Sequence, residues 1–526
     1  MNSLKVLDVT LRDGGCVNDF DFGQLYMEKI LAAQEESGID VIEVGYIDEK
    51  RGSISGRTQY INDQVIKQSI LKQKKKGITY VAMIDYGKYD VNKLMPADEE
   101  SIDGIRMAFH KKDRREIITL GKTIIDKGYE LYIQPMITLR YSDAELLEFI
   151  DMINKELPEA SGFYIVDSFG EMRPNDMARI LNLVDHNLIP SMTLGFHSHN
   201  NLQLSYSNAM AMLKFPTPRD LMLDCSIMGM GKGAGNLNTE LLLEHLNLFY
   251  GKTYKVAPLL EVIDKVINQL HDEFYWGYAP EYYLSSANHC SPSYASHFYN
   301  KHMLPIDQVG ELLGMIEEEK KISFDKNYAE KIYRQYNESK TVDDHAVVEE
   351  LRTEFNGKRV LLIAPGRSVL DAKDHIMEIA SQEDVVSIGL NNYIGLDYVL
   401  TTRNEMFIDA LSAGKKIIVP SNVSKGGRGN VKVLNYKDWI EVDERTHDSS
   451  SVIALKLLQH CGVKNILLAG FDGFSIDINE NYYDISMRHP VNAEQAERRN
   501  AYYKQLINRV TLSGIRIEFI TSSKYE

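Results

Sequence analysis

Two histidines and one aspartate have the residue types and spacing of a catalytic metal site. His197 and His199 are two positions apart in the apolar segment TLGFHSH, and residues i and i+2 of an extended strand point to the same side. Asp13 follows a second apolar segment, LKVLDV. Two imidazoles and one carboxylate leave coordination positions open on a divalent metal, which suits catalysis. The alternative is that two surface histidines are close by chance. The elements that carry these residues therefore decide whether a metal site is expected.

Those elements alternate between short apolar runs and longer amphipathic stretches over the first 250 residues or so. Segments such as 24–38 and 143–157 place apolar residues at helical spacing. Strand–helix alternation predicts a parallel sheet, and eight units in about 250 residues predict a TIM barrel. An open doubly wound sheet is the alternative. The eight expected strands are LKVLDV, DVIEVGY, TYVAMID, IDGIRMA, ELYIQPMI, GFYIVDS, TLGFHSH and LMLDCSI.

Active sites of TIM barrels gather at the carboxyl ends of the strands. The segment TLRDGG follows the first expected strand, HSHNN ends the seventh, and GMGKGAGN follows the eighth. Glu43 lies within the second strand. We therefore expect these segments to meet at one mouth of the barrel.

These strings also carry a resemblance. DVTLRDGG resembles the signature of the DRE-type TIM-barrel metallolyases, the HMGL-like family, and GFHSHNNLQLSYSNA resembles that family's metal-binding strand. GMGKGAGNLNTE resembles its glycine-rich loop. The motifs occur in the family's order and cover about the first 300 residues. The chain is most similar to the 4-hydroxy-2-oxovalerate aldolases within this family.

The resemblance implies a metal site and its cofactor. Asp13, His197 and His199 would bind the metal, and Asn236 stands where some members supply a further ligand. The expected cofactor is Mn²⁺ or Mg²⁺, with Zn²⁺ or Co²⁺ as alternatives.

The resemblance also implies roles around the metal. Arg12 would face the substrate carbonyl and stabilise an enolate, whose negative charge requires a cation and a Lewis acid. Glu43 matches a family acid near the metal, although a structural hydrogen bond is an equal alternative. Ser168, in VDSFG, matches a position that can contact the carboxylate of a 2-oxo acid.

Proton transfer is the point at which the chain departs from the aldolases. Tyr282, in WGYAPEYYLSS, matches a tyrosine that could act as acid or base, or could simply pack below the barrel mouth. Cys16 stands where those aldolases carry a histidine base. A cysteine of ordinary pKa is mostly protonated at neutral pH. Either His110 or Tyr282 takes the proton instead, or the reaction differs.

With 526 residues, the chain is expected to form more than one domain. We expect a barrel over 1–254, a helical extension and linker over 255–350, and a Rossmann-like α/β domain over 351–526. Helices are predicted at 256–274 and 307–320, and the charged stretch 336–351 is a linker or an exposed helix. The strands expected in the last domain are KRVLLIAP, VVSIGLNN, YVLTT, KKIIVP, KNILLAGFD and IRIEFITSS.

The last domain resembles the bacterial sialyltransferase and DUF115-type fold. The resemblance rests on the turn at 364–368, on Asn391 with Asn392, and on the segment SSSVIALKLLQHCGVKNILLAGFD. It implies a nucleotide or nucleotide-sugar ligand. The residues expected to contact it are Gly366, Ser368, Asn391, Ser450 and Ser451.

The alternative for this domain is a role in assembly or regulation without catalysis. His489 could be the base of a glycosyl transferase, but a loop histidine is the preferred interpretation. The run SKGGRGN could face a phosphate or form an ordinary hairpin turn.

Composition limits the partners. The net charge of −16 argues against a nucleic-acid partner, which requires a basic face. The four cysteines lie far apart with no CxxC pair, which fits a reducing compartment. We find no signal-like start and no apolar run long enough to span a membrane. We expect a cytoplasmic protein that forms homo-oligomers.

The expected function is that of a metal-dependent carbon–carbon lyase. It would cleave a 2-oxo acid into a pyruvate-like unit and an aldehyde, or catalyse the reverse reaction. The fused second domain suggests sugar or cell-surface glycan metabolism. The alternatives are a Claisen-type synthase that uses acyl-CoA and a glycosyl or nucleotidyl transferase with a vestigial barrel. A scaffold protein is disfavoured because the metal-ligand set is intact.

Overall fold

The computed structural model describes residues 3–50, 54–71, 74–301, 304, 306–395, 397–424, 429–440, 449–484 and 493–526. The chain divides into two compact units, Met1–Lys301 with Ile306–Asp325, and His302–Pro305 with Lys326–Glu526. Each unit is described by itself. His489 and four residues of the SKGGRGN run lie outside the described residues.

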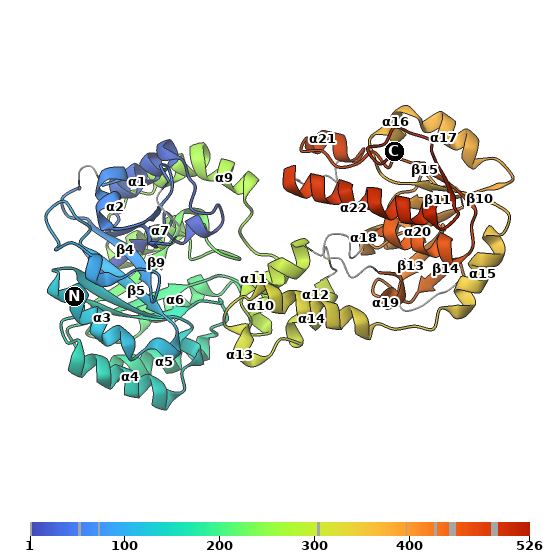
Figure 1. The fold of residues 1–526 in the computed structure, drawn as a ribbon. Coiled ribbons are helices and arrows are strands. Elements are labelled where there is room, and N and C mark those ends of the chain that lie inside the picture. Colours follow the sequence, from blue (N-terminus) through green and yellow to red (C-terminus); the bar gives the residue numbers. More distant parts are fainter. Residues whose placement is uncertain are drawn as a thin grey trace. The chain divides into compact units, whose positions relative to one another are not determined.

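The first unit contains a closed barrel of eight parallel strands (Figure 1). Strand β1 pairs with β2 on one side and with β9 on the other, which closes the ring and rules out the open sheet. The short β3 (Gln59–Tyr60) is added beside β2. All eight expected strands are confirmed: β1 (Leu4–Asp8), β2 (Val41–Ile47), β4 (Thr79–Asp85), β5 (Gly104–Phe109), β6 (Glu130–Pro135), β7 (Gly162–Asp167), β8 (Thr193–Ser198) and β9 (Leu221–Cys225).

Helices connect and surround the strands (Figure 1). Their ends have local causes. Helix α4 begins with a capping box between Ser142 and Glu145, and α1 ends at Gly38, whose φ of 77° favours glycine. The helices are α1 (Gln24–Ser37), α2 (Asp63–Ser69), α3 (Glu116–Asp126), α4 (Asp143–Glu156), α5 (Pro174–Asn187), α6 (Ser205–Lys214) and α7 (Thr239–Tyr250).

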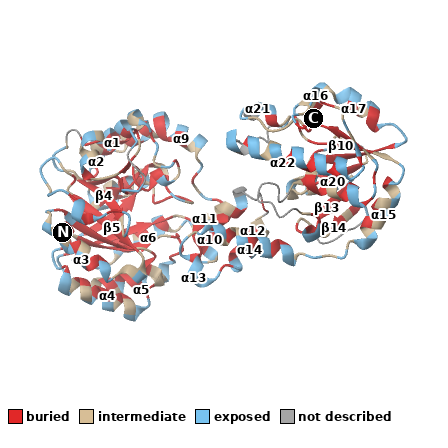
Figure 2. Ribbon diagram, in the orientation of Figure 1, coloured by how far each residue is buried: buried red, intermediate tan, exposed pale blue. Residues whose placement is uncertain are grey.

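The two-residue period of the strands separates the barrel interior from the helix layer. In β8, Leu194 and Phe196 pack in the core that also contains the helices, so His197 faces inward. In β5, Ile105 and Met107 face the helices, so Arg106 faces inward. The strands are buried on both sides (Figure 2). The apolar part of the interior consists of Leu7, Val9, Val41, Val81, Tyr132, Tyr164, Val166 and Met222.

A helical extension completes the first unit. The helix expected at 256–274 is confirmed, with a π-helical turn, η6 (Ile263–Ile267), between α8 (Ala257–Val262) and α9 (Asn268–Glu273). The prediction of a single helix at 307–320 is wrong, because the structure has two helices there. Helix α12 (Ile306–Gly314) ends before Ile316, which is buried, and the extended Glu317 begins α13 (Glu318–Lys321). Helices α10 (Pro280–Ala287) and α11 (Pro292–Ser296) lie between them in sequence.

The second unit is a doubly wound sheet in the order β14-β13-β12-β11-β10-β15-β16, with every pair parallel. Its order reverses between β10 and β15. The six expected strands are present, and β14 was missed because it is short and follows the glycine-rich run. The strands are β10 (Arg359–Ile363), β11 (Val385–Leu390), β12 (Tyr398–Leu400), β13 (Lys416–Pro420), β14 (Val431–Leu434), β15 (Asn465–Ala469) and β16 (Arg516–Phe519).

Helices cover both faces of this sheet. Residues of α15, α20 and α22 pack against Val360 and Leu362 on one face, and residues of α16 and α17 pack against Leu361 and Ile363 on the other. The stretch 336–351 is divided between α14 and α15. The helices are α14 (Lys326–Ser339), α15 (His345–Phe355), α16 (Ser368–Asp371), α17 (Lys373–Ala380), α18 (Asn404–Ser412), α19 (Tyr436–Trp439), α20 (Ser450–His460), α21 (Ile478–Asn481) and α22 (Ala493–Leu512).

Across the described residues, no helix combines the length and the apolar character that crossing a membrane requires.

Candidate metal centre

Asp13, His197 and His199 meet at the carboxyl end of the barrel. Each offers one ligand atom, and these atoms lie within 4.8 Å of one another. The three residues are 3%, 5% and 8% exposed, so protein rather than bulk water surrounds them. The two imidazole rings stand nearly perpendicular, with centroids 5.3 Å apart. This arrangement could hold a metal ion.

Asn236 connects the loop after β9 to this group. Its amide nitrogen donates to Oδ2 of Asp13 at 2.7 Å, while its amide oxygen is buried without a hydrogen bond. Gly231 packs closely against this pair. A Cβ on Gly231 would lie 2.3 Å from Nδ2 of Asn236 and 2.7 Å from Oδ2 of Asp13, so a larger residue would not fit there. The glycine-rich loop therefore brings Asn236 to the aspartate.

The protonation states of the group suit a cation. Burial opposes ionisation of Asp13, but the charge of Arg12 and the nearby imidazoles outweigh it and lower its pKa well below the ordinary range. Burial also lowers the pKa of His199 to about 4, although Asp13 opposes that shift. His199 is therefore neutral at pH 7, and its buried Nδ1 has no hydrogen bond. A carboxylate and a neutral imidazole are the forms that bind metals.

A buried network of charges supports the group from within the barrel. Arg12 donates from Nε to Glu43 at 2.7 Å and from Nη1 to Asp13 at 2.7 Å. Arg106, which is fully buried, donates to the same Glu43 oxygen at 2.8 Å and also to Asp224. Burial opposes the charge of Arg12, but Glu43 and Asp13 raise its pKa, so it remains a cation.

Through Asp224, this network of charges contacts His197, one of the three candidate metal ligands. Oδ2 of Asp224 is 2.9 Å from Nδ1 of His197, which leaves Nε2 of that ring for a metal. Sequence reasoning missed Arg106 and Asp224. The available signal was a charged residue at an inward position of an otherwise apolar strand, IRMAF or LMLDC.

The part of the chain that carries this group is similar to a known family. The HMGL-like family model matches residues 3–249. The N-terminal barrel is therefore similar to the HMGL-like family. A 4-hydroxy-2-oxovalerate aldolase from Roseiflexus castenholzii is 28% identical over 274 residues, or 49% of this chain and 79% of the relative. One from Thermomicrobium roseum is 28% identical over 49% of this chain and 73% of the relative. Among solved structures, the HMG-CoA lyase of Brucella melitensis is 14% identical with a TM-score of 0.42, covering 52% of this chain and all of that one.

Two of the remaining predicted residues line a cavity at the mouth of the barrel. Cys16 and Tyr282 face a space of about 870 Å³ between the barrel loops and the helical extension. The Cys16 side chain is accessible, but crowding at the mouth removes water from the thiol. This desolvation, with the charge of Asp13, raises the pKa of Cys16 to about 12. The thiol is therefore protonated at neutral pH.

Ser168 and His110 stand at other strand ends of the same mouth. Ser168 follows β7, and its hydroxyl oxygen accepts a hydrogen bond from the backbone of Ile137 at 3.0 Å. His110 follows β5, and desolvation lowers its pKa despite the charge of Asp85. Asp85, the last residue of β4, was missed. Burial raises its pKa, although a hydrogen bond with Tyr46 and the charge of Arg12 oppose that shift.

The structure brings only some of the predicted nucleotide-binding residues together. Asn391 donates to the hydroxyl of Ser450 at 3.1 Å, and Ser450 and Ser451 begin α20 as expected. At the turn after β10, the backbone and hydroxyl of Ser368 donate to Asp472. Gly366 leaves no room for a side chain beside Gly470. A carboxylate thus occupies the donors that a phosphate would use, and nucleotide binding stays a prediction.

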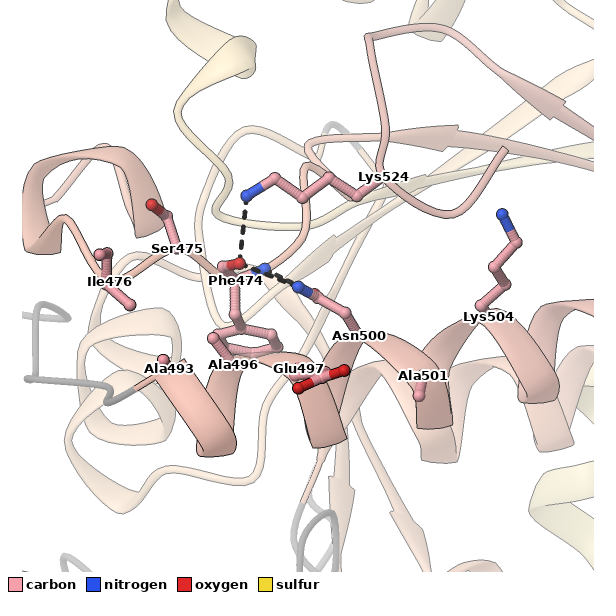
Figure 3. Close-up of a pocket in the computed structure, with 10 residues that line it drawn as sticks. All are labelled: Phe474, Ser475, Ile476, Ala493, Ala496, Glu497, Asn500, Ala501, Lys504 and Lys524. Carbon is pink, nitrogen blue, oxygen red and sulfur yellow. Dashed lines mark hydrogen bonds between the residues drawn. The ribbon is translucent and has the colours of Figure 1, made fainter.

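A further cavity of the second unit, of about 540 Å³, lies beside α22 (Figure 3). The side chain of Asn500 bridges the backbone nitrogen and oxygen of Phe474 at 2.7 and 2.9 Å. Lys524 also donates to that oxygen at 3.1 Å. Because these polar groups satisfy one another, the cavity offers few free hydrogen-bonding groups to a ligand.

The pairing of Asp224 with His197 leads to a prediction. We expect Asp224→Asn to weaken Mn²⁺ binding by about 10- to 100-fold, because the carboxylate fixes the ring whose other nitrogen would bind the metal. Calorimetric titration of the metal-free protein with Mn²⁺ measures the affinity. Asp143→Asn, on the surface of α4, is the matched control and should leave the affinity unchanged. Equal affinities in the two variants would contradict this role for Asp224.

Proposed function

We propose that the N-terminal barrel is a divalent-metal-dependent aldolase or lyase that cleaves or forms a carbon–carbon bond through a pyruvate-like enolate. The observation that carries this proposal is the buried group of Asp13, His197 and His199 beside the arginine Arg12. The match to the HMGL-like family model supports the metal and the reaction class, and relatives named 4-hydroxy-2-oxovalerate aldolase support the 2-oxo acid.

The residues present fit a divalent cation. His199 and Asn236 each have a buried polar atom without a hydrogen bond beside the Asp13 carboxylate. This is expected of atoms that bind a metal ion. Carboxylate, imidazole and amide oxygen together suit Mn²⁺ or Mg²⁺, with Zn²⁺ and Co²⁺ as further candidates. When bound, the cation would supply Lewis acidity to the oxygens of the 2-oxo acid.

Arg12 stabilises the charge that develops on the substrate. Its Nε and Nη1 are committed to Glu43 and Asp13, but its buried Nη2 has no hydrogen-bond partner. This group can donate to the oxygen that becomes negative as the enolate forms. Glu43 positions Arg12, since it accepts from both Arg12 and Arg106. Ser168, which is partly exposed, is proposed to contact the carboxylate of the 2-oxo acid.

His110 or Tyr282 is proposed to transfer the protons of the reaction. In cleavage, the base removes the proton of the hydroxyl on the carbon that becomes the aldehyde. The electrons of the breaking carbon–carbon bond pass to the ketone as an enolate, which then takes a proton at carbon. Cys16 is excluded as the base because its thiol stays protonated at neutral pH. The lowered pKa of His110 leaves its imidazole neutral, and Tyr282 lines the cavity at the mouth.

The proposal is tested without an aldehyde. In D₂O with Mn²⁺, we expect the protein to exchange the methyl protons of pyruvate for deuterium, because enolate formation is reversible. Proton NMR of pyruvate follows the exchange, and a chelator should stop it. If pyruvate keeps its protons with each of Mn²⁺, Mg²⁺, Zn²⁺ and Co²⁺, the proposed function is wrong. Incubation with acyl-CoA and a 2-oxo acid tests the Claisen-type alternative in parallel.

The wider context also remains a proposal. A role in sugar or cell-surface glycan metabolism, a nucleotide ligand of the second unit and homo-oligomer formation rest on the sequence patterns alone.

A further inference from the structure

The cavity at the barrel mouth contains a carboxylate that has no hydrogen-bond or ion-pair partner among the described residues. Glu281, the second residue of α10, lines this cavity and is only 7% exposed. Its carboxylate forms no hydrogen bond or ion pair with any described residue. Its oxygens are not among the fully buried atoms that lack a hydrogen bond, so a ligand in the cavity can reach them. Glu281 is therefore placed to accept hydrogen bonds from a ligand in the cavity.

The rest of the cavity wall offers hydroxyl groups and aromatic rings. Ser293 and Ser296 come from α11, and Ser296 hydrogen-bonds the hydroxyl of Tyr282. Phe274 and Phe324 add aromatic surface. Hydroxyl groups can both donate and accept, a carboxylate only accepts, and rings pack against C–H groups. These groups together suit a chain in which each carbon carries one hydroxyl and one hydrogen.

The charges of the cavity do not require a strongly anionic ligand. Asp19 forms an ion pair with Arg57, in which Nη1 lies 3.1 Å from Oδ2. This leaves one carboxylate, Glu281, and one ammonium, Lys232, among the described lining residues. A neutral polyhydroxylated chain would give Glu281 charge-assisted hydrogen bonds, which are stronger than neutral ones.

The cavity is also lined by residues of the loops that carry the proposed metal group. Cys16 lines it and lies three residues after Asp13 in the same loop, and Lys232 interacts electrostatically with both Cys16 and His199. A substrate whose 2-oxo acid end lies at the metal group can therefore extend its other end past Cys16 toward Glu281.

We propose that this cavity holds the aldehyde half of the substrate, that this half is a polyhydroxylated, aldose-like chain, and that Glu281 recognises its hydroxyl groups. This inference rests on the proposed aldolase function and adds the class of aldehyde. It assigns Glu281 to specificity, while the metal group and Arg12 serve every aldehyde alike.

The first test compares aldehydes of equal length in Mn²⁺-dependent condensation with pyruvate. We expect kcat/KM for D-glyceraldehyde to exceed that for propanal at least about tenfold, and the same for D-erythrose over butanal. One good charge-assisted hydrogen bond is sufficient for a ratio of this size. Equal values for hydroxylated and alkyl aldehydes would overturn the inference. Pyruvate exchange without an aldehyde reports separately on the proposed function.

The second test assigns the selectivity to Glu281. In Glu281→Gln, we expect the ratio of kcat/KM for glyceraldehyde over propanal to fall about tenfold, because an amide accepts hydrogen bonds more weakly than a carboxylate. Glu319→Gln makes the same chemical change at an exposed position of α13 and should keep the ratio. An unchanged ratio in Glu281→Gln contradicts the role of Glu281.

A binding measurement keeps the inference testable if the catalysed reaction is another one. Saturation-transfer NMR on the metal-free protein should show binding of erythritol and not of 1,4-butanediol, which has the same number of carbons and fewer hydroxyls. Glu281→Gln should lose the erythritol signal, and Glu319→Gln should keep it. If erythritol does not bind, or binds no better than the diol, the cavity does not recognise a polyhydroxylated chain.

Discussion

Asp13→Asn is expected to abolish Mn²⁺ binding at micromolar concentrations and to slow pyruvate exchange on the order of a thousandfold. The amide has the shape of the carboxylate but no charge, and Lewis-acid stabilisation of a developing enolate is worth several kcal/mol, where each 1.4 kcal/mol is about tenfold in rate. Calorimetry gives the Mn²⁺ affinity and proton NMR gives the exchange rate. The two measurements should fall together, because both depend on the same carboxylate.

The fold should survive this substitution. Arg12 would keep its hydrogen bond to Glu43, so the variant does not leave that guanidinium without a partner. Asp126→Asn, at the exposed end of α3, is the matched control and should preserve both affinity and exchange. An Asp13→Asn protein that binds Mn²⁺ like the wild type would remove Asp13 from the metal group. One that binds no Mn²⁺ yet exchanges pyruvate normally would separate the chemistry from the metal.

The sequence was sufficient to predict the barrel and the three residues of the metal group, because both depend on local periodicity. Each barrel strand is an apolar run. His197 lies on the inner face of β8, and the two-residue spacing directs His199, one residue after the end of β8, to the same side whatever the neighbouring strands do. Asp13 could be added because it follows a strand, and all parallel strands of a barrel end at the same mouth. None of these steps requires knowledge of distant contacts.

The charged residues that position the metal group contact one another between strands that are distant in sequence. No local sequence pattern predicts such contacts. Arg106 in β5 meets Glu43 in β2 and Asp224 in β9, which are 63 and 118 residues away in sequence. Each is a single charge in an apolar strand. Only the closure of the barrel shows that Arg106 pairs with both carboxylates. Glu281 was missed for a related reason, since the packing of α10 decides whether a glutamate near a helix start is exposed or faces a cavity.

Where local preference and packing compete, packing decides. The segment 307–320 has the composition of one helix, yet burial of Ile316 interrupts it. Strand β14 has only four residues, too few for an alternation pattern, and its pairing with β13 fixes it.

Arg106→Met is expected to destabilise the first unit by about 3–5 kcal/mol, because it leaves the buried carboxylate of Asp224 without its arginine, while Glu43 keeps Arg12. Arg106 is fully buried, as is Glu43, and Asp224 is nearly so. Methionine has a similar length and fills much of the space, so lost packing contributes less than the unpaired charge. Urea unfolding of the metal-free protein, followed by circular dichroism, measures the change.

Arg179→Met is the matched control for Arg106→Met. Arg179 also pairs with a carboxylate, that of Asp143, but at the surface, where such a pair is worth about 0–1 kcal/mol. Adding Asp224→Asn to Arg106→Met should recover part of the lost stability, since the unpaired charge disappears. If Arg106→Met costs no more than Arg179→Met, the inner charges are neutralised by protonation or by water instead. The network would then not hold Asp224 as the anion that orients His197, and the metal group would have to be positioned by the loops after β8 and β9 alone.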